Sequence, residues 1–227
     1  MTTTGPAAKL QPHLQPHLQS QPKLKPRERV LGAAAQLFLR DGIHAVGVDR
    51  LAIEAGVSKR SIYQHFEGKD AIVAQMLREY GPRVVASYFD TADGLAPRER
   101  VLHVYDALHA AAEASDFFGC PFVNVATELR DRAHPAAIVA QEFKLQLTDF
   151  FERQAVAAGA ASPHVVAVQL TLLFDGAAAS AAMCGGTPLA AKLAAETLFD
   201  AAVENAPVEN AAVENAPVEN AAAQNGA

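Results

Sequence analysis

The chain has 227 residues, of which 50% are hydrophobic, and it carries a formal net charge of −6. This length allows one large domain or two small ones, and the dominance of alanine over β-branched residues favours helices over strands. Two cysteines, Cys120 and Cys184, lie far apart and outside any CxxC spacing, which supports neither a disulfide framework nor a structural zinc site.

The N-terminal residues 1–26 are rich in proline and glutamine and repeat the segment QPHL. Proline at this density blocks regular helix, so we expect a disordered arm. The arm lacks the apolar segment of a signal peptide, and we expect a cytoplasmic protein.

The charge is unevenly distributed. Residues 1–80 carry 11 Lys and Arg against 7 Asp and Glu, whereas residues 81–227 carry 8 against 18. A basic first part on an acidic remainder is typical of a chain whose first part binds a polyanion. Uneven surface charge without function is the simpler alternative.

Four helices are predicted in the first part of the chain, at about 27–40, 48–55, 59–65 and from residue 69 onward. Between the second and the third, Gly56 permits a left-handed turn, Val57 fills the core and Ser58 caps the next helix. Two short helices joined by such a turn form a helix-turn-helix, whose second helix can lie in the major groove of DNA.

The helix at 59–65 carries an unusual density of hydrogen-bond donors. Ile62 and Phe66 are four residues apart and are expected to face inward. Lys and Arg match guanine, Gln matches adenine, and Tyr, His and Lys match phosphate oxygens. The residues left on the outer side are Lys59, Arg60, Ser61, Tyr63 and Gln64. The pattern predicts a DNA-reading helix; a solvated helix face is the alternative.

Residues 27–77 closely resemble the DNA-binding domain of the tetracycline-repressor (TetR) family of bacterial transcription regulators. The resemblance rests on the stretch AAAQLFLRDGIHAVGVDRLAIEAGVSKRSIYQHFEGKDAIV, and above all on Ala-Gly-Val-Ser, Ile-Tyr-x-His-Phe and Gly-Lys within it. It implies a helix-turn-helix DNA-binding domain at 27–77, followed by an effector-binding and dimerisation domain at 78–200.

The resemblance also implies roles by position. The residues that match base-edge or nearby phosphate positions are Lys59, Arg60, Ser61 and Gln64. Those that match phosphate-binding positions are Tyr63, His65 and Lys69. Where the family usually has Ser or Thr at the start of the second helix, this chain has Gly47 followed by Val48. Only a backbone contact with phosphate is therefore expected there.

Later helices are predicted to begin at prolines, where the missing N–H has no intrahelical partner in any case. These prolines are Pro97, Pro121, Pro135, Pro163 and Pro188, with Ser162 and Thr187 as candidate caps of the last two helices. The Gly81-Pro82 pair is expected to kink or break the fourth helix. The prediction is an all-α protein of about nine helices.

Residues 163–183 form a long apolar helix whose second half is nearly all Ala, Gly and Ser. We interpret it as a core helix rather than a membrane span. Small residues allow close helix approach, so we expect a homodimer through 163–183 and 187–200; tight internal packing is the alternative. Asp175 on this helix needs a partner, from solvent, from across the interface or from a ligand.

By analogy with the family, an effector cavity is expected among the middle helices. An apolar cavity with a few polar groups is typical of such sites, although aromatic residues at helical spacing are usually core. The candidate lining residues are His103, Tyr105, His109, Phe117, Cys120, Phe122, Asn124, Glu128 and Phe143.

The segment GCPFVN at 119–124 places Cys120 directly before a predicted helix start. A helix N-terminus lowers the pKa of a thiol, which favours a redox- or electrophile-sensing hypothesis if the thiol is accessible. A buried, unreactive cysteine is the commoner outcome.

Residues 201–220 repeat a five-residue unit four times, and we expect a disordered tail at 201–227. The resemblance implies a ligand-responsive regulator, a dimeric repressor that binds a palindromic operator and is released by a small-molecule effector. No GxSxG, P-loop, GxGxxG or HExxH motif occurs, so we expect no enzymatic activity and no metal or cofactor. An architectural DNA-binding protein without an effector is the alternative.

Overall fold

The computed structural model describes residues 24–89, 94–114, 116–186 and 188–204. Over these ranges the chain forms nine helices and no strand, which confirms the all-α prediction. The helices are α1 (Pro26–Asp41), α2 (Val48–Ala55), α3 (Lys59–His65), α4 (Lys69–Phe89), α5 (Pro97–Ala112), α6 (Pro121–Leu129), α7 (Pro135–Ala157), α8 (Pro163–Cys184) and α9 (Leu189–Glu204).

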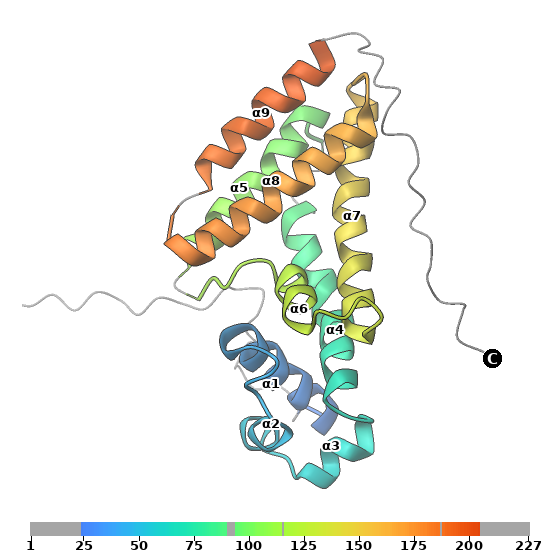
Figure 1. Cartoon of the computed structure of the whole chain (residues 1–227), viewed down its shortest axis with the longest axis vertical. Helices are drawn as coiled ribbons and strands as arrows, with labels where there is room; N and C mark the ends of the chain where they lie inside the picture. The colour runs from blue at the N-terminus through green and yellow to red at the C-terminus, as the bar shows by residue number, and fades with distance from the viewer. Residues whose placement is uncertain (1–23, 90–93, 115, 187, 205–227) are drawn as a thin grey trace, which may run out of the picture.

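The first three helices and the start of α4 lie at one end of the molecule, and α4 runs from them into the larger helical part (Figure 1). Leu31, Leu51 and Ile62 are fully buried where α1, α2 and α3 meet. The same core includes Phe122 from α6 and Phe143 from α7. The two parts of the chain are therefore joined by continuous apolar packing.

The turn between α2 and α3 forms as the local sequence predicts. Gly56 ends α2 in the left-handed conformation, with φ 60°, which glycine adopts without steric strain. The Ser58 hydroxyl then accepts a hydrogen bond from the Ser61 N–H (3.1 Å) and caps α3. These two signals fix the helix-turn-helix from short-range interactions alone.

Of the kink or break predicted at Gly81-Pro82, the break is wrong, because α4 continues through both residues to Phe89. Gly81 is buried, and a Cβ added there would clash with the Phe143 ring. The glycine thus allows α7 to pack closely on α4, and this tertiary contact holds the helix together across the proline. The predicted domain boundary at 77/78 falls inside this helix.

The second core lies between α5, α7, α8 and α9. Tyr105, Phe151 and Phe199 are its largest buried side chains. The Tyr105 hydroxyl donates to the Leu170 carbonyl oxygen at 2.7 Å, which satisfies its hydrogen-bonding capacity inside the core. Burial also raises the pKa of this phenol, so it remains protonated.

Four of the five predicted proline starts hold, at α5, α6, α7 and α8. Helix α1, predicted to begin near Arg27, begins one residue earlier at Pro26. Ser162 stands at the cap position of α8, but its side chain makes no capping hydrogen bond. Helix α9 begins at Leu189, one residue after Pro188. Its last four residues, 201–204, are the first four of the segment predicted as a tail. The predicted cap Thr187, residues 1–23 of the arm and 205–227 of the tail lie outside the described residues.

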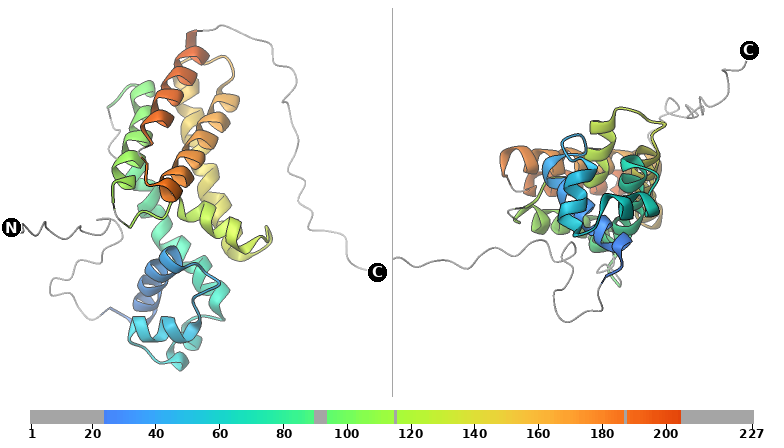
Figure 2. Two further views of the ribbon diagram at one scale, coloured as in Figure 1. Left: turned by 60° about the vertical axis from the view of Figure 1, so that its left-hand side comes forward. Right: turned by 90° about the horizontal axis from the view of Figure 1, so that it is seen from below.

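By length and composition, α8 is the one helix among the described residues that could cross a membrane. It lies beside α9 (Figure 2) and packs on α7. Its buried residues include Leu170, Phe174 and Ala178, which belong to the second core. One face of α8 is thus a core face, as the core-helix interpretation expected.

Candidate nucleic-acid interface and ligand cavity

Helix α3 separates its apolar and polar residues onto two faces. Ile62 and Phe66 are buried in the first core, whereas the outer residues are exposed except for the half-buried Ser61. The exposed residues are Lys59, Arg60, Tyr63, Gln64 and His65. Tyr63 is the most exposed of the four tyrosines, at 58%. The donor set predicted from the sequence therefore forms one accessible surface at the end of the molecule.

The ammonium group of Lys59 pairs with the Asp49 carboxylate in the first turn of α2. Both side chains are largely exposed, so the pair is weak and open to exchange with another anion. The ion pair links the N-terminal ends of α2 and α3, the two ends that would face a phosphate backbone.

The start of α2 offers backbone donors only. Gly47 is the N-cap, with no side-chain capping bond, and its carbonyl accepts from the Leu51 N–H at 3.2 Å. The N–H groups of the first turn have no acceptor within the helix and are available to an anion. Val48 is half-buried against the first core, so its side chain is an anchor rather than a polar contact.

Lys69 begins α4 and is half-buried. Its Nζ donates a hydrogen bond to the Ile43 carbonyl oxygen at 3.0 Å. An ammonium has three donors, and this contact occupies one of them. The residue predicted to bind phosphate is therefore held by the turn between α1 and α2.

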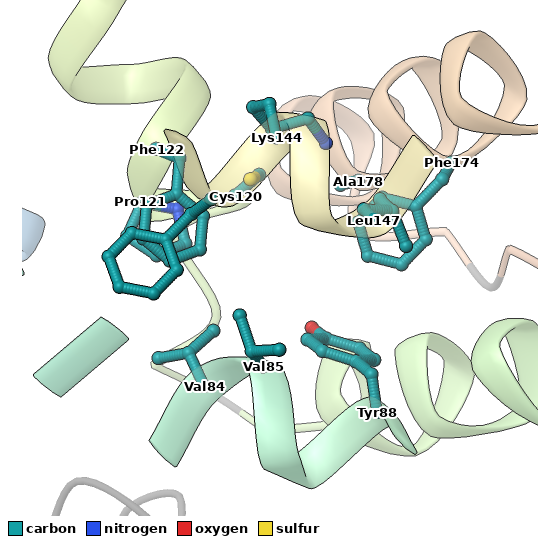
Figure 3. Close-up of a pocket in the computed structure, with 11 residues that line it drawn as sticks. Val84, Val85, Tyr88, Cys120, Pro121, Phe122, Lys144, Leu147, Phe174 and Ala178 are labelled. Atoms are coloured by element: carbon teal, nitrogen blue, oxygen red, sulfur yellow. The ribbon is translucent and has the colours of Figure 1, made fainter. Parts of the chain in front are cut away.

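A small cavity lies where α4, α6, α7 and α8 meet (Figure 3). Its lining residues are Val84, Val85, Tyr88, Cys120, Pro121, Phe122, Phe143, Lys144, Leu147, Phe174 and Ala178. A water-sized molecule can occupy about 30 Å³ of it. Any larger ligand therefore requires the surrounding side chains to move.

One ion pair borders this apolar cavity. Lys144 of α7 contacts the Asp175 carboxylate of α8 at 2.5 Å, and both side chains are mostly buried. The Lys144 ammonium also lies 5.2 Å from the centre of the Phe174 ring, within cation–π range. The partner that Asp175 needs is thus Lys144 of the same chain, which none of the three alternatives drawn from the sequence named.

The Cys120 thiol and the Tyr88 hydroxyl are the uncharged polar groups of the cavity. Burial raises the pKa of the Cys120 thiol, although Lys144 and the first N–H groups of α6 act in the opposite direction. Burial likewise raises the pKa of Tyr88. The predicted activation of Cys120 by the helix N-terminus is therefore outweighed by desolvation.

Three of the nine residues predicted for the effector site line this cavity: Cys120, Phe122 and Phe143. Four others have different surroundings. Tyr105 is a core residue, and His109 lies near Glu113, the residue that follows the end of its helix. Asn124 donates to the Phe118 carbonyl oxygen at 2.7 Å, and Glu128 contacts the turn between α1 and α2. His103 and Phe117 are half-buried and lie outside the cavity.

The lining residues that sequence reasoning missed come mostly from α4, α7 and α8. They are Val84, Val85, Tyr88, Pro121, Lys144, Leu147, Phe174 and Ala178. One signal was available in the sequence. Lys144 directly follows Phe143 and precedes Leu147 on an otherwise apolar helix face, and Asp175 interrupts the apolar run of α8. Two opposite charges on two apolar helices predict a buried pair, although not its location.

An apolar face of α8 and α9 is exposed to solvent. Leu172 and Met183 on α8 are 66% and 81% exposed, and Leu193 on α9 is 56% exposed. Between the first two lie the small residues Gly176, Ala179 and Ser180, all exposed. Exposed apolar residues that gather on one face are typical of a surface that binds a partner.

Residues 30–76 match the family model described as bacterial regulatory proteins, tetR family. A crystal structure of a TetR-type transcriptional regulator from Streptomyces avermitilis is 45% identical, and the match covers 79% of this chain and 98% of that chain with a TM-score of 0.74. A TetR-family transcriptional regulator from Streptomyces coelicolor is 26% identical, with coverage of 79% and 94% and a TM-score of 0.70.

Curated relatives match over the N-terminal part. The transcriptional repressor KstR2 of Mycobacterium tuberculosis is 34% identical over 88 residues, which are 38% of this chain and 44% of KstR2. The transcriptional activator FasR of Mycolicibacterium smegmatis is 37% identical over 65 residues, 29% of this chain and 30% of FasR. The matches thus span less than half the length of these two relatives.

Proposed function

Because the chain belongs to the TetR family of bacterial regulatory proteins, we propose that it is a homodimeric transcriptional repressor that a small molecule releases from its DNA operator. The observation that carries the proposal is the accessible donor surface of α3, held in place by the buried Ile62 and Phe66. Binding to chromosomal DNA requires a cytoplasmic location.

In the proposed complex, α3 lies in the major groove. Lys59 leaves Asp49 and, with Arg60, Ser61 and Gln64, approaches base edges, where charged and amide groups discriminate between bases. The groups assigned to phosphate are the side chains of Tyr63, His65 and Lys69 and the backbone at Gly47 and Val48. They set the position of the helix without reading sequence.

The proposed dimer forms through the exposed apolar face of α8 and α9. Burying Leu172, Met183 and Leu193 against a second copy removes apolar surface from water. A twofold axis there places the two α3 helices on two half-sites about 34–36 Å apart, which explains why a palindromic operator is expected.

The proposed effector binds at the cavity between α4, α6, α7 and α8 and opens it. The cavity borders α4, the helix that leads back to the DNA-binding part. A ligand that favours the opened state lowers DNA affinity by its coupling factor, typically about 5–150-fold. The Lys144–Asp175 pair is neutral overall, so an uncharged, mainly apolar ligand leaves no unpaired charge inside.

Two alternatives are less well supported. An architectural protein has no need of a cavity lined by aromatic side chains. A thiol sensor at Cys120 requires an accessible thiolate, whereas burial raises the pKa of this thiol.

The test is selection of DNA from a randomised duplex pool, followed by sequencing of the retained duplexes. The proteins are the wild type, Lys59→Ala, Tyr63→Phe and, as a matched control, Arg153→Ala, which removes an exposed cation of α7 far from α3. We expect a palindromic site for the wild type and the control. Lys59→Ala should degrade sequence preference, and Tyr63→Phe should weaken binding without changing the site.

Retention of duplexes without any sequence preference supports the architectural alternative. If the wild type retains no DNA, the proposed function is wrong. With an operator in hand, small uncharged aromatic compounds are then screened for release of the labelled duplex; an architectural protein shows no release.

A further inference from the structure

Glu128, in the last turn of α6, is hydrogen-bonded to the turn between α1 and α2. Its carboxylate accepts hydrogen bonds from the backbone N–H groups of Ile43 (2.9 Å) and His44 (2.7 Å), 85 and 84 residues away in the sequence. The His44 ring nitrogen Nδ1 lies 3.0 Å from the same carboxylate. One carboxylate of the larger helical part is thus hydrogen-bonded to the α1–α2 turn.

The peptide between Ile43 and His44 is held at both ends by charged groups. Its N–H donates to Glu128, and its carbonyl oxygen accepts from the Lys69 ammonium at 3.0 Å. A peptide placed between an anion and a cation is polarised, which strengthens both hydrogen bonds. Glu128 and Lys69 therefore act on each other through one backbone unit without direct contact.

The turn is shaped to receive this carboxylate. Gly42 has φ 86°, and a Cβ added there would lie 3.2 Å from the Glu128 Oε1. On its other side, Ile43 and Val46 are buried in the first core. The α1–α2 turn is thus held by apolar packing on one side and by the Glu128 carboxylate on the other. These two sets of contacts restrict its movement.

The other end of α6 lies at the cavity. Cys120, Pro121 and Phe122 line the cavity, whereas Glu128 is at the opposite end of a helix that begins at Pro121 and ends at Leu129. A helix of this length spans only about 12 Å and moves as a rigid unit. Displacing its first turn therefore displaces the Glu128 carboxylate.

We propose that Glu128 is a positioning residue of the DNA interface: it fixes the Ile43–His44 peptide and, through that peptide, holds the Lys69 ammonium where it binds a DNA phosphate. The inference rests on the proposed function, since it assumes that Lys69 faces DNA. It also specifies how α6 transmits the state of the cavity: opening the cavity withdraws the carboxylate and releases Lys69.

Whether Glu128→Gln raises or lowers DNA affinity distinguishes this positioning role from a long-range effect of charge. Glu128→Gln removes a negative charge and therefore a source of repulsion toward the DNA phosphates. By long-range electrostatics alone, this change should raise affinity for DNA. A glutamine amide can accept through its oxygen only, so one of the two backbone N–H groups loses its acceptor. The proposal therefore expects affinity to fall.

The experiment measures the dissociation constant for the selected operator as a function of KCl concentration. The proteins are the wild type, Glu128→Gln, Lys69→Met, the double variant and the control Glu142→Gln, which removes an exposed charge of α7. Each lost phosphate contact reduces the slope of log affinity against log salt by about 0.9, so Lys69→Met should reduce it by about 2 in a dimer.

We expect Glu128→Gln to reduce the slope by a similar amount and to weaken binding about tenfold. The double variant should show no further reduction, because both changes remove the same phosphate contact. The control Glu142→Gln should leave the slope unchanged.

A second variant distinguishes the loss of this contact from a general loss of folding. Glu128→Asp keeps the charge but withdraws the carboxylate by about one C–C bond length; we expect the reduced slope here also, in protein whose circular dichroism matches the wild type. A wild-type slope for both Glu128 variants overturns the inference while the proposed function stands. Failure of the wild type to bind any duplex overturns the proposed function itself.

Discussion

At Glu128, hydrogen bonds outweigh the effect of burial on ionisation. Partial burial favours the neutral acid, but the N–H groups of His44 and Ile43 lower the pKa of this carboxyl below its ordinary value of 4.5. Because the pKa is lowered on folding, the stabilisation is fully present above the unfolded-state pKa and is lost as pH falls through the folded-state pKa.

Glu128→Gln should therefore reduce the free energy of unfolding by about 1–2 kcal/mol at pH 7. The difference from wild type should stay constant down to about pH 5 and shrink below the ordinary carboxyl pKa of 4.5. Urea unfolding of both proteins at pH 7, 5, 4 and 3 measures it. A difference that is the same at pH 3 and pH 7 contradicts a role for the ionised carboxylate.

The two cysteines provide an internal comparison of reactivity. Cys184 is exposed at the end of α8, whereas burial raises the pKa of Cys120, so at pH 7 the Cys120 group is a protonated thiol. Native Cys184→Ser protein should label slowly with monobromobimane, and native Cys120→Ser protein should label rapidly. Both variants should label fully in urea. Fast labelling of native Cys184→Ser revives the thiol-sensor alternative.

Among the helices, those fixed by local chemistry were predicted closely and those fixed by tertiary packing were not. The bounds of α2 and α3 follow from Gly56 and Ser58, whose effects act within a few residues. Gly81-Pro82 carries the local signal of a break, yet α4 is continuous there because the Phe143 ring packs against Gly81. A contact with a residue 62 positions later in the chain has no signature in the local sequence.

The role of Gly81 predicts opposite outcomes for two glycine substitutions. Gly81→Ala should destabilise the protein by about 1–3 kcal/mol, because the added methyl group overpacks against Phe143. Gly32→Ala in α1, where the nearest atom is the Tyr80 hydroxyl at 3.4 Å, should stabilise it by about 0.5–1 kcal/mol through helix propensity. Thermal unfolding compares the two. Stabilisation by Gly81→Ala contradicts the close packing of α4 on α7.

For the whole molecule, the sequence predicted the exposed polar face of α3 more fully than the lining of the cavity. The α3 residues Lys59 to His65 are contiguous, so one helix pattern separates the exposed from the buried ones. The cavity instead combines single residues of four helices, such as Tyr88, Lys144 and Phe174. Helix periodicity tells which face of each helix is apolar, but the mutual rotation of the helices decides which apolar residues border a space.

The assembly of two copies is a prediction about the α8 and α9 face. Leu172→Glu places a charge on that face, where Leu172 is 66% exposed, and desolvating it in an interface is unfavourable. The control Leu145→Glu changes an equally large residue on α7 that is 54% exposed. In sedimentation velocity, the wild type and Leu145→Glu should be dimers, and Leu172→Glu should dissociate.

Operator affinity should follow the assembly state. Two linked recognition helices bind their half-sites with an affinity about 100-fold or more above that of one, because the second contact is intramolecular. Leu172→Glu should lose this factor although no DNA-facing residue is changed, and it should regain binding at protein concentrations that restore the dimer. Dissociation of Leu145→Glu instead would place the interface on α7, and an undisturbed dimer for both variants would remove α8 and α9 from it.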